Sequence, residues 1–122
     1  MEAVWALSNA TAIAEPVQME YMVQKDLIKA LSECLKIDEV SIVAISIQGL
    51  NNILKCGQAN FMEDGFNKFA IIAEANGLLD ELEALQYHKN HNIYKSAAQI
   101  IEDYFGDDEE DNVIQVIDNA AA

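Results

Sequence analysis

The strongest constraint on the fold of this chain is that its sequence repeats itself. A shift of 51 residues places apolar positions on apolar positions over two stretches: Ile28 on Leu79, Leu31 on Leu82, Ile42 on Ile93 and Leu54 on Phe105. A shift of 43 residues places Leu7 on Leu50 and Asn9 on Asn52. Repetition at a fixed period is typical of chains that stack one small unit several times. The sequence therefore predicts a stack of similar units.

Each unit is predicted to consist of helices, because apolar residues recur at helical spacing along most of the chain. We expect helices over residues 2–13, 16–24, 27–36, 39–58, 66–75, 78–88 and 92–105, and a loop over residues 60–65. Pro16 suits a first helical turn, where its missing N–H costs nothing. Asp26 and Asp38 are suited to cap the helices that follow them. Asn76-Gly77 is a good signal for a helix end.

The order of these helices is short, medium and long, and then the same again. Three-helix units of about 40–47 residues are typical of armadillo repeats. The predicted fold is therefore all-α, a fragment of an armadillo-repeat solenoid that winds into a right-handed superhelix. We assign residues 1–15 to the third helix of an incomplete repeat, 16–59 to a complete repeat, 60–105 to a C-terminal repeat and 106–122 to an acidic tail. We expect the chain to come from a longer solenoid, with apolar surface left exposed on its first helix.

The charge of the chain limits its partners. It carries 21 acidic residues and 7 bases, all of them lysine, which gives a net charge of −14. Nucleic-acid binders show a basic surface, so we expect basic proteins rather than nucleic acid as partners. The longest apolar run, SIVAISIQGL, is too short to span a bilayer, and no membrane partner is predicted.

No residue pattern indicates catalysis or a cofactor. Cys34 and Cys56 have neither zinc nor redox spacing, and we expect both to be buried, reduced thiols of an intracellular protein. His88 and His91 form an H-x-x-H pair without a third ligand, so no metal site is predicted. No glycine-rich phosphate loop occurs. The chain is therefore predicted not to be an enzyme.

Two stretches of the sequence resemble the importin-α family of nuclear import adaptors. Residues 2–11, EAVWALSNAT, are similar to the third helix of a late armadillo repeat of that family. Residues 83–111, EALQYHKNHNIYKSAAQIIEDYFGDDEED, are similar to its closing repeat and acidic tail. By position, the units resemble the end of the eighth repeat, the ninth and the tenth. The resemblance implies a protein found in both cytoplasm and nucleus.

The resemblance also implies a peptide site, because the third helices of this family line a concave groove. A Trp-x-x-x-Asn pair reads nuclear localisation signals there, and Trp5 and Asn9 form such a pair one helical turn apart. An indole face attracts a lysine ammonium by roughly 0.5–2 kcal/mol, and an amide can hold an extended peptide backbone. Glu2 is placed to add attraction. Trp5 also fits a core position of an amphipathic helix, and the sequence leaves that alternative open.

The later units lack a complete pair. The two shifts place Gln48 and Gln99 at the position of Trp5, and Asn52 and Asp103 at the position of Asn9. This chain is therefore expected to hold at most the edge of the family's minor site. Asn52 either contributes to that site, caps a helix, or bridges neighbouring third helices.

The last repeat is expected to dock transport factors. In the importin-α family, the C-terminal repeat and acidic tail engage the export receptor, and a nucleoporin binds the same end. The residues expected to take part are Glu83, Tyr87, Glu102, Asp103, Asp107, Asp108, Glu109, Glu110 and Asp111. Tyr87 and Tyr94 are otherwise expected to pack repeats together. The resemblance further implies importin-β as a partner of the full-length protein, through a segment absent here. The alternative is a general armadillo scaffold that is not devoted to nuclear import.

Overall fold

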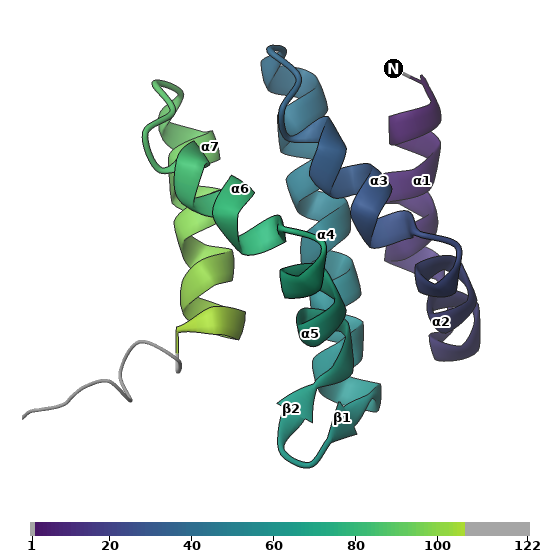
Figure 1. The fold of residues 1–122 in the computed structure, drawn as a ribbon. Helices are drawn as coiled ribbons and strands as arrows, with labels where there is room; N and C mark the ends of the chain where they lie inside the picture. Colours follow the sequence, from purple (N-terminus) through teal and green to yellow (C-terminus); the bar gives the residue numbers. More distant parts are fainter. Residues whose placement is uncertain (1, 107–122) are drawn as a thin grey trace, which may run out of the picture.

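The computed structural model describes residues 2–106 of the chain, and its long elements are all helices (Figure 1). The predicted all-α fold is confirmed. The elements are α1 (Glu2–Ile13), α2 (Pro16–Gln24), α3 (Leu27–Cys34), α4 (Val40–Asn60), β1 (Met62–Glu63), β2 (Phe66–Asn67), α5 (Lys68–Ala75), α6 (Leu78–Leu85), α7 (His91–Ile100) and the π-helical turn η1 (Ile101–Phe105). Both α1 and α2 have the predicted bounds.

The third helices of the predicted units, α1, α4 and α7, lie side by side. Figure 1 shows α1, α4 and α7 as three neighbouring upright helices, with α3 and α6 crossing over one face of them. Helix α4 packs against α1 on one side and α7 on the other. This order of elements is the one that the repetition of the sequence predicts. The repeat boundaries themselves stay a prediction.

Two helix caps differ from the prediction. Asp26 precedes α3, but its side chain makes no capping hydrogen bond, and its backbone is left-handed with φ of 69°. The chain therefore turns sharply at Asp26 instead of being capped by its carboxylate. Helix α4 is preceded by Glu39 rather than Asp38, and Glu39 also makes no side-chain cap. Both prediction errors have the same cause, because a capping residue type does not fix its backbone geometry.

Residues 60–65 do not form the predicted loop. Asn60 ends α4, and β1 and β2 pair as a short antiparallel hairpin. Asp64 and Gly65 connect the strands with φ values of 54° and 83°, the positive pair that a tight two-residue hairpin turn requires. Asp-Gly between two extended residues is a strong hairpin signal, so this element was readable from the sequence.

Asn67 joins the hairpin to the helices around it. Its side-chain oxygen accepts hydrogen bonds from the backbone N–H groups of Phe69, at 2.9 Å, and Ala70, at 3.3 Å. Its side-chain nitrogen donates to the carbonyl of Leu54 in α4, at 2.9 Å. Asn67 therefore caps α5 and fastens it to α4. A methyl group at Gly57 would overlap the Asn67 side chain, so this contact needs glycine in α4.

The core runs along the chain through both units. Its fully buried large side chains include Met19, Ile28, Leu31, Leu50, Ile53, Leu54, Phe69, Leu78 and Leu82. Gly49 lets α1 approach α4, because a Cβ there would lie 3.0 Å from Leu31 and 3.3 Å from the Ser8 hydroxyl. That hydroxyl donates to the carbonyl of Ile45 at 3.0 Å. The α1–α4 interface is therefore both closely packed and hydrogen-bonded.

Apolar side chains remain exposed on α1, as expected. Ile13 is 84% exposed, Trp5 51% and Leu7 37%. The two cysteines differ from the prediction: Cys34 and Cys56 are half-buried instead of buried. Burial raises the pKa of the Cys56 thiol, and a hydrogen bond with Asn60 partly offsets this. Among residues 2–106, none of the helices has both the length and the apolar composition needed to span a membrane.

Candidate functional site

Trp5, Asn9 and Asn52 line one hollow between α1 and α4. Its volume is about 270 Å³, and its other lining residues are Ser8, Ala12, Ile45 and Gln48. The structure therefore brings together three of the four residues expected in the peptide site. Glu2 begins α1, but its side chain lies outside what the structure describes. Its contribution stays a prediction.

Trp5 is not a core residue of this chain. It is 51% exposed, whereas the buried side chains of α1 are Ser8 and Thr11. Asn9, one turn further along, is also exposed. The core alternative for Trp5 is therefore wrong, and its indole is accessible at the mouth of the hollow. An accessible indole beside an amide can contact both a cation and a peptide backbone.

Asn52 connects the two helices that form the hollow. Its side-chain nitrogen donates to the hydroxyl of Thr11 at 3.1 Å, and that hydroxyl donates to the carbonyl of Ser8. The sequence left three roles open for Asn52: part of the peptide site, a helix cap, or a bridge between third helices. Its contacts are those of a bridge. Asn52 is half-buried, whereas Trp5 and Asn9, which line the same hollow, are exposed.

A second hollow follows on the other side of α4. It lies between α4 and α7–η1, has a volume of about 190 Å³, and is lined by Ile47, Asn51, Ser96, Gln99, Ile100 and Asp103. The side-chain nitrogen of Gln99 donates to Asp103 at 2.9 Å. The repetition of the sequence related Gln99 and Asp103 to Trp5 and Asn9, but it did not show that a hollow persists where the tryptophan is missing.

The residues expected to dock transport factors do not form one surface within residues 2–106. Glu83 and Tyr87 line a shallow hollow with Tyr94 where α6 leads into α7. Glu102 and Asp103 are exposed in η1, at the opposite end of α7 (Figure 1). At 1.5 Å per residue, α7 and η1 together separate these groups by roughly 20 Å. Asp107, Asp108, Glu109, Glu110 and Asp111 lie outside the described residues.

The packing role expected of Tyr87 is wrong, and the one expected of Tyr94 stays a prediction. Tyr87 is 91% exposed and Tyr94 is 40% exposed. Their apolar rings fit the repeating pattern, but α6 ends at Leu85 before Tyr87. The ring of Tyr94 faces His91, with 5.9 Å between ring centroids. Both tyrosines are therefore available to a partner.

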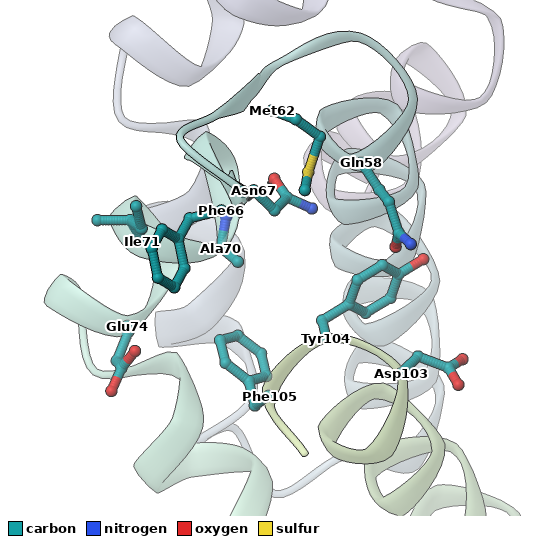
Figure 2. A pocket seen from close by; sticks show the side chains of 11 residues that line it. Gln58, Met62, Phe66, Asn67, Ala70, Ile71, Glu74, Asp103, Tyr104 and Phe105 are labelled. Atoms are coloured by element: carbon teal, nitrogen blue, oxygen red, sulfur yellow. Dashed lines mark hydrogen bonds between the residues drawn. The ribbon is translucent and has the colours of Figure 1, made fainter. Parts of the chain in front are cut away.

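A further hollow lies between the hairpin, α5 and η1 (Figure 2). Its volume is about 190 Å³, and its rim carries the exposed side chains of Met62, Phe66 and Ile71. Figure 2 shows the Tyr104 side chain pointing toward Gln58, on the side of the opening away from Ile71. Burial, together with the nearby charge of Asp103, raises the pKa of Tyr104. Sequence reasoning missed this hollow because it treated the hairpin as a loop.

His88 has a structural role. The Nδ1 atom of His88 accepts a hydrogen bond from the backbone N–H of Asn90 at 2.9 Å, and Asn90 caps α7 through its own side chain. Within residues 2–106 no three His, Cys, Asp or Glu side chains gather in a way that could hold a metal ion. The hollows described above are the candidate functional features of residues 2–106.

Comparison with known proteins places the chain in a family. A family model described as an atypical Arm repeat matches residues 67–119. Importin subunit alpha-4 of Arabidopsis thaliana is 39% identical over 101 residues, which cover 80% of this chain and 19% of that protein. Importin subunit alpha-B of Dictyostelium discoideum is 34% identical over 102 residues, 83% of this chain and 20% of that protein. Importin subunit alpha of Saccharomyces cerevisiae is 35% identical over 100 residues, which cover 80% of this chain and 18% of that protein.

The chain spans about a fifth of the length of these relatives. The relatives come from a plant, an amoeba and a yeast, and all carry the same subunit name. The stacked helices of the structure agree with the Arm repeat that the family model describes. The chain therefore belongs to the importin-α family, of which it is an armadillo-repeat segment.

Proposed function

We propose that this chain is part of a nuclear import adaptor and that the α1–α4 hollow binds a lysine of a nuclear localisation signal. The observation that carries the proposal is the shared hollow of Trp5, Asn9 and Asn52, in which the indole is half-exposed. The family of the chain supports the same role. Because Trp5 and Asn9 form the one complete Trp-x-x-x-Asn pair of the sequence, the chain would supply the edge of the minor site.

The three side chains would act differently on a bound peptide. The face of Trp5 would hold the lysine ammonium and its methylene stem, a contact worth roughly 0.5–2 kcal/mol. Asn9 would exchange hydrogen bonds with the peptide backbone and so fix its register. Asn52, already bonded to Thr11, would keep α1 and α4 at the spacing that the peptide requires. The net charge of −14 would attract basic cargo before contact.

We further propose that the last repeat docks the export receptor and a nucleoporin, as the adaptor passes between cytoplasm and nucleus. Two separate patches would serve this purpose, Glu83 with Tyr87 and Glu102 with Asp103. The exposure of Tyr87 supports the first patch, because aromatic side chains are enriched at protein interfaces. Two patches roughly 20 Å apart could serve two partners or one large one.

The peptide site is tested directly by the fluorescence of Trp5, because it is the one tryptophan in the sequence. Titration with a lysine-rich localisation peptide should change its emission, and calorimetry should give the same affinity. Asn9→Ala should weaken binding several-fold, since a lost hydrogen bond is worth about 1 kcal/mol. Asn92→Ala is a matched control, because Asn92 is exposed on α7 and outside the hollow.

Trp5→Ala should remove most of the binding measured by calorimetry while the circular dichroism of the chain stays helical, because half of the side chain is exposed. Unchanged emission with peptide, together with equal calorimetric affinities for the Trp5→Ala and unsubstituted chains, would reject the site. The chain would then be better described as a general armadillo scaffold.

A further inference from the structure

We propose that the second hollow, between α4 and α7–η1, is a second cation subsite for the same peptide. In this subsite the carboxylate of Asp103 would pair with a lysine or arginine a few residues from the one held at Trp5. The inference rests on the proposed function, because it extends the groove that Trp5 begins. It changes the expected ligand from a single lysine to an extended peptide with two spaced basic residues.

The two hollows are lined by residues at equivalent positions of the sequence repeat. In the first hollow, α4 contributes Ile45, Gln48 and Asn52. Adding 51 to each number gives Ser96, Gln99 and Asp103, which are lining residues of the second hollow. The same helix positions therefore form the same wall of each hollow, although the side chains differ. The groove continues past Asn52 with a carboxylate in the place of an amide.

The charge of the second hollow suits a cation better than a peptide amide. Asp103 is exposed, and Gln99 donates to one of its carboxylate oxygens at 2.9 Å. A neutral donor orients a carboxylate without cancelling its charge. The ion pairs among the described residues involve Lys36 and Lys68, and none reaches Asp103. Asp103 also lines the hairpin hollow, and Figure 2 shows its carboxylate directed away from Phe105.

The spacing of the helices sets the spacing of the basic residues. Packed helices lie roughly 8–10 Å apart, and an extended peptide advances about 3.3 Å per residue. Trp5 lies on α1 and Asp103 lies in η1 after α7, with α4 between them. A peptide that reaches from Trp5 to Asp103 therefore crosses two such spacings and needs about five or six residues. The preferred ligand would be a peptide in which a second lysine or arginine follows or precedes the first at about that distance.

The test uses the full chain and three peptides whose binding is followed by Trp5 emission and calorimetry. The first peptide has two lysines about five positions apart, as the two helix spacings require. The second is an isomer with the same composition in which the second lysine is about ten positions away. The third has one lysine. Asp103→Asn should weaken the first peptide about two- to fivefold, as expected for an exposed ion pair, and should weaken the other two no more than the loss of one distant negative charge does.

Asp38→Asn is the matched control for this test. It removes the same charge from an exposed residue in the turn before α4, and it should weaken all three peptides equally and slightly. Asn preserves the acceptor for Gln99, so circular dichroism and the unfolding midpoint should not change in Asp103→Asn. Raising the salt concentration should reduce the difference between the first and second peptides.

The outcomes separate the two proposals. If no peptide changes Trp5 emission, the peptide site itself is absent and both proposals fail. If all peptides bind at Trp5 but Asp103→Asn affects them no more than Asp38→Asn does, the groove exists and the second subsite is wrong. A selective loss for the first peptide would establish the subsite.

Discussion

Two asparagine caps within residues 2–106, Asn67 and Asn90, allow a sharp test of how the hairpin is attached to the solenoid. Asn67 and Asn90 cap α5 and α7 in the same way, each accepting from two backbone N–H groups. Asn67 also donates to the carbonyl of Leu54 in the neighbouring helix α4. Replacing each by alanine therefore removes the same cap, but Asn67→Ala removes one tertiary hydrogen bond in addition.

The expected magnitudes follow from these contacts. Loss of a capping asparagine costs about 1 kcal/mol. The Leu54 carbonyl lies inside α4, where it keeps its helical hydrogen bond. Loss of the hydrogen bond between Asn67 and this carbonyl therefore lowers the free energy of unfolding by the net contribution of one hydrogen bond, about 1 kcal/mol. We expect the free energy of unfolding to fall by about 2 kcal/mol for Asn67→Ala and about 1 kcal/mol for Asn90→Ala.

Urea unfolding followed by circular dichroism measures the difference. With a slope of about 1.5 kcal/mol per molar urea, Asn67→Ala should lower the midpoint by roughly 1.3 M and Asn90→Ala by about half of that. The slope should not change, because the same surface is exposed on unfolding. Equal midpoints for the two variants would refute the reasoning, since the bond to Leu54 would then contribute nothing.

Three further predictions concern packing, ionisation and a buried hydroxyl. Gly49→Ala should lower the thermal midpoint by an amount equivalent to about 1–3 kcal/mol, because its Cβ would lie 3.0 Å from Leu31; an unchanged midpoint would show that Leu31 moves freely. The hydrogen bond and charge of Glu20 raise the pKa of Lys68. The interaction between Lys68 and Glu20 therefore stabilises the folded chain in full below the ordinary lysine pKa of 10.5. This stabilisation is lost as the pH rises through the raised pKa of Lys68. As the pH rises through this range, the unfolding midpoint should fall less for Glu20→Gln than for the unsubstituted chain. An identical fall in the two proteins would show that Glu20 does not raise the pKa of Lys68. Ser46 is fully buried and its hydroxyl has no partner among the described residues, so Ser46→Ala should leave stability unchanged or raise it by up to about 1 kcal/mol; a clear loss measured by urea unfolding would reveal a hidden hydrogen bond.

The candidate site could be predicted in part from the sequence. The spacing of Trp5 and Asn9 placed them on one helical face, and the repetition related Asn52 to Asn9 in the next unit. These are properties of helical periodicity and need no tertiary information. The turn at Asp64-Gly65 is likewise a local feature of the sequence. The hairpin was predicted as a loop because its Asp-Gly signal was not used. The hollow beside that hairpin was missed as a consequence.

Other features depended on contacts between segments far apart in the sequence. Asn52 donates to Thr11 across 41 positions, and no local pattern separates that role from peptide binding or capping. Asp26 and Tyr87 behaved differently from their residue types because the path of the backbone decided their environment. The half-burial of Cys34 and Cys56 likewise depends on which neighbours cover each helix face.

The sequence by itself determined that the chain forms helices, that the helices come in equivalent sets, and that Trp5 and Asn9 share a face. The tertiary structure decided which faces meet, how far Trp5 is exposed, and that a hollow persists beside Asp103. The physical reason lies in the range of the interactions. Helical periodicity and helix-end signals act within a few residues and are written in order along the chain. Exposure and the shape of a groove arise where α1, α4 and α7 pack, and that packing is set by side chains about 40–50 positions apart.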